Sequence, residues 1–139
     1  PKTSGADGVH IFIPLRPNTP HEAGLLFCQI VATLVSERHR TVATVERAVR
    51  SRGARVYIDY LQNIMGKTLA SAYSARATES AGVSAPLTWR EVHEGVNRED
   101  FTIRSMPQRL RDAGDLWAGL RTSKGVDLGR AIQRLESRV

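Results

Sequence analysis

The sequence reads Arg52-Gly-Ala-Arg-Val-Tyr-Ile-Asp-Tyr-Leu-Gln-Asn63 near its centre, and this stretch places an apolar strand between a group of arginines and a carboxylate. Side chains alternate along a strand, so Tyr57 and Asp59 point to the face opposite the aliphatic residues. A carboxylate at the end of an apolar strand is costly unless it is solvated, paired or bound to a metal. For Asp59, a salt bridge with Arg52 or Arg55 is favoured, and a metal ion is the alternative.

Positive charge is concentrated just before this strand, where four arginines fall within nine residues: Arg47, Arg50, Arg52 and Arg55. The whole chain carries 20 Lys+Arg against 14 Asp+Glu, a net charge of +6 and a pI near 10.2. Such a balance suits a polyanionic partner such as nucleic acid or a triphosphate. The alternative is an ordinary basic surface that keeps a small protein soluble.

Composition indicates a globular protein. With 139 residues, 41% of them hydrophobic and 24% charged, we expect a single domain spanning residues 1–139. The longest apolar stretch, residues 24–35, is too short to span a bilayer, so no membrane partner is expected. No signal peptide is recognisable before it, which predicts a cytoplasmic location. The single cysteine, Cys28, excludes an internal disulfide and is expected to fill the core.

Alternating and turn-forming residues predict the strands. We expect strands at residues 10–15 and 55–59, and a third strand at 67–74 that pairs back as a hairpin. The small residues at 78–86 predict a loop. Together with the helices below, these elements define an α+β fold with a mixed or antiparallel sheet, helices packed on one face and a helical C-terminal tail.

Capping signals predict four helices. The first runs from about residue 20 to 40, with Thr19 as its N-cap, and the second from Thr88 to about Gly95 behind a capping box. Apolar residues at helical spacing predict a third helix opened by Ser105 and a fourth capped by Asp127. Their apolar positions are Met106, Leu110, Ala113, Trp117 and Leu120 in the third, and Leu128, Ile132, Leu135 and Val139 in the fourth. The chain is thereby divided into a sheet region at residues 1–77 and a helical region at 78–139.

A glycine-rich turn precedes the first strand, in the stretch Thr3-Ser-Gly-Ala-Asp-Gly-Val-His10. Glycines let backbone N–H groups approach an anion, and a hydroxyl and an imidazole lie nearby. A plain strand-entry turn has the same composition and is the favoured reading of these residues by themselves.

The order of motifs resembles a known family, the primase-polymerase domain of bacterial ligase D. The resemblance covers about residues 2–119 and rests most on the block Asp59-Tyr-Leu-Gln-Asn63 followed by Tyr73-Ser-Ala-Arg76. The other matching motifs are Ser4-Gly-Ala-Asp-Gly-Val-His10, Thr44-Val-Glu-Arg47, Gly66-Lys-Thr68, Pro86-Leu-Thr-Trp89 and Asp100-Phe-Thr102. It implies the mixed α+β core of archaeo-eukaryotic primases and templated nucleotidyl transfer at double-strand breaks, in non-homologous end joining.

The resemblance also implies roles for individual residues. Asp59 matches the third catalytic aspartate, which joins an Asp-x-Asp pair to hold two divalent metals, Mg2+ or Mn2+. Ser4 and His10 match residues that contact the incoming triphosphate, Arg52 and Arg76 match residues that neutralise its phosphates, and Gln62 matches a polar residue near the nucleotide sugar. Guanidinium groups suit such a role because they bind phosphate oxygens in a bidentate manner.

Two departures from the family pattern predict low activity. Asp7 stands where the family has a phosphate-binding lysine, and an anion there should repel a triphosphate. No Asp-x-Asp occurs in the 139 residues, and one carboxylate does not hold two magnesium ions against water. We therefore expect metal binding to be weak or absent, and catalysis to be lost, in this chain alone.

Three hypotheses follow for the function. The chain is one half of an end-joining polymerase that a complementing N-terminal half completes, or a degenerate stand-alone binder of DNA or nucleotide, which Asp7 favours. A third reading, an interaction module, rests only on the helices. As partners, the family implies DNA ends, a nucleoside triphosphate, a ligase domain and an end-binding Ku-type protein. It also implies that the protein is bacterial and associated with the nucleoid. An uncovered sheet would also favour a homo-oligomer.

Overall fold

A computed structural model of the chain describes residues 1–137, so the predicted apolar position Val139 lies outside the described residues. The chain forms two compact units. The first unit combines Pro1–Pro14 with Leu69–Lys124, and the second combines Leu15–Thr68 with the segment from Gly125 on. None of the described helices is long and apolar enough to cross a membrane.

In the first unit, a two-stranded antiparallel sheet lies beside a buried segment of small residues. Strand β1 (Lys2–Thr3) pairs with β2 (Val9–His10), and Lys2 lies directly opposite His10. Around the sheet follow α3 (Trp89–Glu94), the short 3-10 helix η2 (Arg98–Asp100), α4 (Met106–Ala113) and α5 (Ala118–Arg121). The apolar core is formed by Val83, Ala85, Leu87, Phe101 and Met106.

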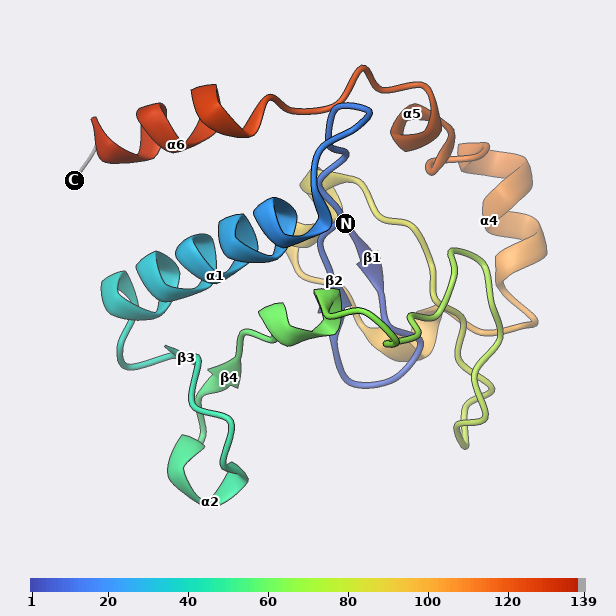
Figure 1. The fold of residues 1–139 in the computed structure, drawn as a ribbon. Helices are drawn as coiled ribbons and strands as arrows, with labels where there is room; N and C mark the ends of the chain where they lie inside the picture. Colours follow the sequence, from blue (N-terminus) through green and yellow to red (C-terminus); the bar gives the residue numbers. More distant parts are fainter. Residues whose placement is uncertain (138–139) are drawn as a thin grey trace. The chain divides into compact units, whose positions relative to one another are not determined.

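The second unit is built on the long helix α1 (His21–Arg38), against which α6 (Leu128–Glu136) packs (Figure 1). Strand β3 (Ala43–Thr44) pairs in parallel with β4 (Val56–Tyr57), and α2 (Val49–Arg52) lies between them along the chain. The 3-10 helix η1 (Tyr60–Asn63) follows β4 and packs on α1. The buried positions of α1 are Phe27 and Ala32.

Local capping signals predicted several elements correctly. Helix α3 has the predicted capping box, in which Thr88 and Glu91 satisfy each other's backbone N–H groups. Helix α6 begins behind Asp127, whose carboxylate accepts a hydrogen bond from the Arg130 backbone. The α+β class is confirmed, and α1 lies where a helix was expected. The predicted N-cap of α1 is wrong, because Pro20 occupies that position and the Thr19 hydroxyl donates to the Arg16 carbonyl.

The strand and loop predictions around residues 67–86 are wrong in a consistent way. Residues 67–74 form no strand, and Tyr73 adopts a positive φ of 65°. Of the predicted loop, residues 78–81 do form a turn, with Glu79 and Ser80 exposed, but residues 82–86 are buried at the centre of the first unit instead. Their small side chains permit this, since a Cβ on Gly82 would lie 2.5 Å from the Gly5 carbonyl oxygen. Small size signalled close packing here, and not a solvated turn.

Three further predictions need correction. The expected strand at residues 10–15 is paired in β2 only at His10, and Ile11 is 60% exposed because no strand within residues 1–137 continues the sheet past it. The expected third helix is split at Gly114, whose φ of 69° ends α4. A tryptophan at a helical position is more often a core anchor than a base-stacking platform. Trp89 is nevertheless 55% exposed, whereas Trp117 packs edge-on against Phe12 as a core anchor would.

Candidate nucleotide-binding site

The turn between β1 and β2 is shaped by Ser4. Its hydroxyl oxygen accepts hydrogen bonds from the backbone N–H groups of Ala6 at 3.1 Å and Gly8 at 3.0 Å. The Ser4 backbone N–H in turn donates to the Gly8 carbonyl at 2.7 Å. Gly5 has a φ of 79°, which favours glycine. Ser4 therefore orders the turn, because its hydroxyl and backbone bind the N–H groups of Ala6 and Gly8 and the carbonyl of Gly8.

His10 lies at the base of this turn and is paired with a buried lysine. The Lys2 Nζ is 3.0 Å from the His10 Nδ1 and donates to the Ser84 hydroxyl at 2.5 Å. Lys2 is 0% exposed. Burial lowers the pKa of Lys2 to about 8, with the nearby Arg76 charge as a second cause. Burial, followed by the charges of Lys2 and Arg76, also lowers the pKa of His10, so its imidazole is neutral at pH 7.

Arg76 completes this group, which we name the basic cluster: Lys2, His10 and Arg76. The aliphatic stem of Arg76 packs so closely on the turn that a Cβ on Gly5 would lie 2.3 Å from the Arg76 Cγ. Its backbone N–H donates to the Gly82 carbonyl at 2.8 Å. The side chain is exposed, and its guanidinium has no hydrogen bond or ion pair among the described residues. Arg76 can therefore bind an anion without giving up a partner.

The Asp115 carboxylate anchors Tyr73, in the segment that leads to Arg76. The Tyr73 hydroxyl donates to Asp115 at 2.7 Å, and the Arg121 guanidinium donates to the other oxygen at 2.6 Å. These bonds, the tyrosine first, lower the pKa of Asp115 to about 2. The carboxylate is thus ionised throughout the neutral range, and it holds Tyr73 in its positive-φ conformation.

Asp7 forms an ion pair with Arg98, although its side chain is 85% exposed. From the sequence, we expected this anion to repel a triphosphate. The pair gives Asp7 a partner of opposite charge, but an exposed pair in water is weakly held. Asp7 remains a negative charge beside the candidate site.

In the second unit, the predicted salt bridge of Asp59 is wrong. Arg52 donates to the carbonyl oxygens of Glu46 and Arg47, at 3.0 and 2.7 Å. Arg55 likewise donates to the carbonyls of Arg52 and Ser51. Both guanidinium groups therefore close local turns, and no ion pair of Asp59 occurs in the part of the chain that the structure describes.

Asp59 caps η1 instead. One of its carboxylate oxygens accepts from the Leu61 backbone at 3.1 Å and from the Tyr57 hydroxyl at 3.4 Å. Burial and the Asp59 charge raise the pKa of Tyr57, so the phenol stays protonated and able to donate. Arg52 stacks on the Tyr57 ring at 3.9 Å. Gln62 lies exposed in η1.

Asp59 is a suitable ligand for a hard divalent cation, but it is isolated. Among residues 1–137, no group of three or more His, Cys, Asp or Glu side chains could hold a metal ion. Magnesium needs several oxygen ligands placed together. The described side chains therefore supply one carboxylate and do not fit a two-metal centre by themselves.

The six predicted site residues thus divide between the units: Ser4, His10 and Arg76 lie together in the first, and Arg52, Asp59 and Gln62 in the second. Sequence reasoning missed Lys2 and Ser84. A lysine is rarely buried, so nothing in the local sequence marked Lys2 as an internal residue. The pairing of β1 with β2 was the signal that could have found it.

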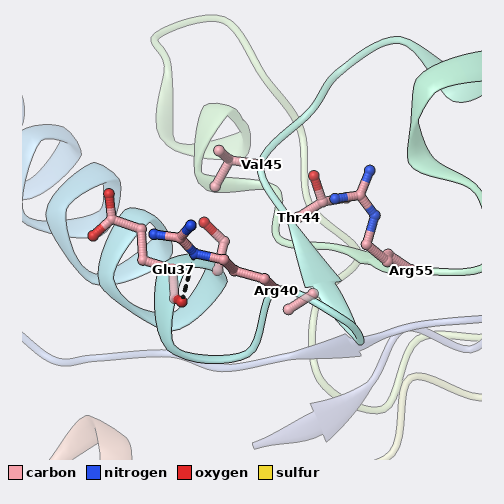
Figure 2. Close-up of a pocket in the computed structure, with 7 residues that line it drawn as sticks. Glu37, Arg40, Thr44, Val45 and Arg55 are labelled. Atoms are coloured by element: carbon pink, nitrogen blue, oxygen red, sulfur yellow. Dashed lines mark hydrogen bonds between the residues drawn. The ribbon is translucent and has the colours of Figure 1, made fainter.

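The second unit also has a shallow pocket that contains none of these six residues. Figure 2 shows it at the end of α1, where the Arg40 guanidinium donates to the Glu37 carbonyl at 3.2 Å and Arg55 lies across the pocket. Thr44 and Val45 form part of its wall (Figure 2). Because both arginines are tied to backbone carbonyls, the pocket is a basic surface feature rather than a preorganised site.

Comparison with known proteins gives consistent matches. Residues 1–117 match the family described as LigD, primase-polymerase domain. The chain is 36% identical over 115 residues to the bifunctional non-homologous end joining protein LigD of Bacillus subtilis, covering 82% of the chain and 19% of that protein. It is 34% identical over 119 residues to the multifunctional LigD of Pseudomonas aeruginosa, covering 82% of the chain and 14% of that protein.

A solved structure matches as well: the polymerase domain of Mycobacterium tuberculosis ligase D in complex with DNA, with a TM-score of 0.80 and 26% identity. The match covers 86% of the chain and 42% of that structure. That structure and this chain share the α+β fold class. Within that class, the chain belongs to the LigD primase-polymerase domain family, a metal-dependent family, and spans less than half the length of the relatives it matches.

Proposed function

We propose that the chain contributes the nucleotide-binding part of a DNA-repair polymerase that acts in non-homologous end joining. The observation that supports this most directly is the basic cluster, in which the imidazole of His10 and the guanidinium of Arg76, unpartnered within residues 1–137, flank a glycine turn. Guanidinium and imidazole N–H groups bind phosphate oxygens, and a glycine turn lets backbone N–H groups approach them. The bound group is a nucleoside triphosphate.

Roles in the second unit follow from the same proposal. Asp59 is one ligand of a divalent metal, Mg2+ or Mn2+, which would stabilise charge on the reacting phosphate oxygens. The remaining carboxylates must be supplied by a segment with an Asp-x-Asp pair. Arg52 offers positive charge beside Tyr57 and Asp59, and Gln62 offers an exposed amide for the sugar.

DNA is the proposed polymer partner. A net charge of +6 favours a polyanion, and a solved relative is a complex with DNA. A ligase domain and a Ku-type protein are proposed as further partners within the same repair reaction, in the bacterial cytoplasm.

Binding of tripolyphosphate and ATP, measured by calorimetry, tests the nucleotide-binding role. His10→Gln and Arg76→Gln should each weaken binding by about tenfold, since each removes a charge-assisted or direct phosphate contact. Arg104→Gln is the matched control, because Arg104 is an exposed arginine of the first unit and is not one of the predicted site residues. Equal affinity of all four proteins would contradict the proposal.

Primer extension separates the polymerase from its alternative, a DNA or nucleotide binder without catalysis. The exposed charge of Asp7 and the isolation of Asp59 favour this second reading. With Mn2+, the chain alone should extend no primer. If the chain is part of a polymerase, adding the segment of a LigD relative that contains the Asp-x-Asp pair should restore primer extension. Asp59→Asn should abolish the restored extension. A chain that binds nucleotide but never gains activity is a binder.

A further inference from the structure

Lys2 is a charged side chain buried at the base of the candidate site, and none of the roles above uses it. Its burial follows from the sheet. Lys2 lies between β2 and the buried segment at residues 84–87, pairing with His10 on one side and bridging to Pro86 on the other. The neighbouring backbone is held by the bond from the Leu87 N–H to the Pro1 carbonyl at 3.0 Å.

The register of the sheet puts Lys2 and His10 on one face. Residues directly opposite each other in an antiparallel pair have their side chains side by side. The Lys2 Nζ accordingly reaches the His10 Nδ1 at 3.0 Å. A second partner fixes the ammonium group, since it donates to the Ser84 hydroxyl, which itself donates to the Thr3 carbonyl at 2.8 Å. This chain of bonds leaves Lys2 one position, pointing at the imidazole.

The chemistry of the two groups then determines which nitrogen of the ring bears the proton. A lysine ammonium has three donors and no acceptor. The Nδ1 facing it must therefore accept, so the single proton of the neutral imidazole lies on Nε2. Within residues 1–137, Nε2 has no hydrogen-bond partner.

We propose that Lys2 is a positioning residue that locks His10 in the Nε2–H form and so presents a neutral N–H donor to a phosphate oxygen. This inference rests on the proposed function for its ligand, whereas the lock itself is a property of the free protein. The charged groups that face the ring are Lys2 and Arg76, and both oppose its protonation. The His10 Nε2–H therefore remains a hydrogen-bond donor, and the ring remains neutral, near neutral pH.

Two-bond proton–nitrogen NMR spectra of the full 139-residue chain test the lock without any ligand. In the wild type, His10 should show a single Nε2–H form and an Nδ1 shifted by an accepted hydrogen bond. In Lys2→Met, the Nδ1 shift should move to that of an unbonded nitrogen, a second tautomer should become populated, and the His10 pKa should rise. Lys124→Met, an exposed control, should leave all three unchanged. A proton on Nδ1 in the wild type, or a folded Lys2→Met with an unaltered ring, overturns the inference.

If Lys2→Met fails to fold, the wild-type spectrum decides alone between the Nε2–H and Nδ1–H forms. Where Lys2→Met folds, tripolyphosphate binding connects the lock to function through a double-mutant cycle of Lys2→Met and His10→Gln. Lys2→Met should weaken tripolyphosphate binding about tenfold when His10 is present, and much less in a chain that already carries His10→Gln. Additive effects overturn the role of Lys2 through His10. Absence of binding by the wild type with a locked Nε2–H form would refute the proposed function and leave the lock standing.

Discussion

Asp7 lies in the turn between β1 and β2, at the position where the family resemblance implies a lysine, and it forms an ion pair with Arg98. Asp7→Lys changes the charge beside the turn by two units and removes the repulsion of a triphosphate. We expect tripolyphosphate to bind at least about tenfold more tightly, measured by calorimetry at low salt.

Asp112→Lys serves as the control for this change. Asp112 is exposed on α4 and accepts a hydrogen bond from Gln108, so its reversal alters the net charge equally without touching the turn. A similar gain in both variants would show that affinity follows total charge and not the position of Asp7.

Gly5 combines a left-handed backbone with close contact to Arg76. Gly5→Ala adds a methyl group 2.3 Å from the Arg76 Cγ, in addition to the strain of a φ of 79°. Gly95 has a similar φ of 86° but nothing within 4 Å of its added Cβ. Both variants should lose about 1 kcal/mol from backbone strain, and Gly5→Ala should lose roughly 1 to 3 kcal/mol more from crowding. Urea unfolding measures the difference, and equal losses would exclude a tight contact at Gly5.

At the scale of elements, helix α3 is held by its capping box and by a bidentate pair. The Glu91 carboxylate accepts hydrogen bonds from Arg109 at 2.7 and 3.0 Å, and Arg109 also donates to the Pro86 carbonyl. Because Pro86 belongs to the buried segment, this pair fastens α3 and α4 to the core of the first unit. The arginine bonds lower the pKa of Glu91 to about 2 from an ordinary 4.5.

A lowered carboxylate pKa stabilises the fold when the pH is above the unfolded value, and this contribution disappears as the pH falls from about 4.5 to about 2. We expect Glu91→Gln to lose about 1 to 3 kcal/mol of unfolding free energy at pH 7 and to flatten the acid dependence in this window. Glu94→Gln, on the same helix, breaks only an exposed contact to Arg90 at 3.9 Å and should change stability by less than about 0.5 kcal/mol. Denaturant unfolding at several pH values from 2 to 7 measures both.

The contrast between α3 and the buried segment explains what the sequence could predict. The capping box at Thr88 and the cap at Asp127 are local, so short spacing was enough to place α3 and α6. The burial of Gly82 and Ser84 depends on β1, which lies about eighty residues away in the chain, and small residues look the same in a loop and in a crowded core. Those positions were therefore misplaced.

The same reasoning applies to the candidate site. His10 and Arg76 were expected from the family motifs, and the structure places both beside the Ser4 turn. The pairing expected for Asp59 was wrong, because Arg52 and Arg55 donate to nearby backbone carbonyls instead of to its carboxylate. Backbone acceptors of this kind are invisible to an argument from charge alone.

At the scale of the whole molecule, the chain has two units, each with its own buried residues, and the predicted nucleotide-binding residues are distributed over both. Sequence periodicity gave no sign of this division, because the strand expected at residues 10–15 runs across the boundary between Pro14 and Leu15. A ligand that binds the folded first unit and not the unfolded chain stabilises that unit, and the stabilisation rises with the logarithm of the ligand concentration above the dissociation constant.

The proposed binding of DNA ends would draw on the positive surface of a chain with a net charge of +6, and its salt dependence tests how the arginines act. Arg47 and Arg50 are exposed, and their guanidinium groups have no hydrogen bond within residues 1–137, in contrast to the tied Arg52 and Arg55. Affinity for a DNA duplex with an overhang should fall steeply between about 50 and about 200 mM salt, because each neutralised phosphate releases counterions.

Arg50→Gln should reduce the logarithmic salt slope by about one and weaken binding equally for all DNA sequences, as expected of a phosphate contact. Arg104→Gln, an exposed arginine of the first unit, removes the same net charge and is the control. Fluorescence anisotropy across a salt series measures both slopes. If the two variants lose the same slope, the arginines before β4 have no special part in DNA binding, and affinity reflects only the overall charge. If Arg50→Gln alone reduces it, the arginine cluster is the surface that holds the DNA backbone.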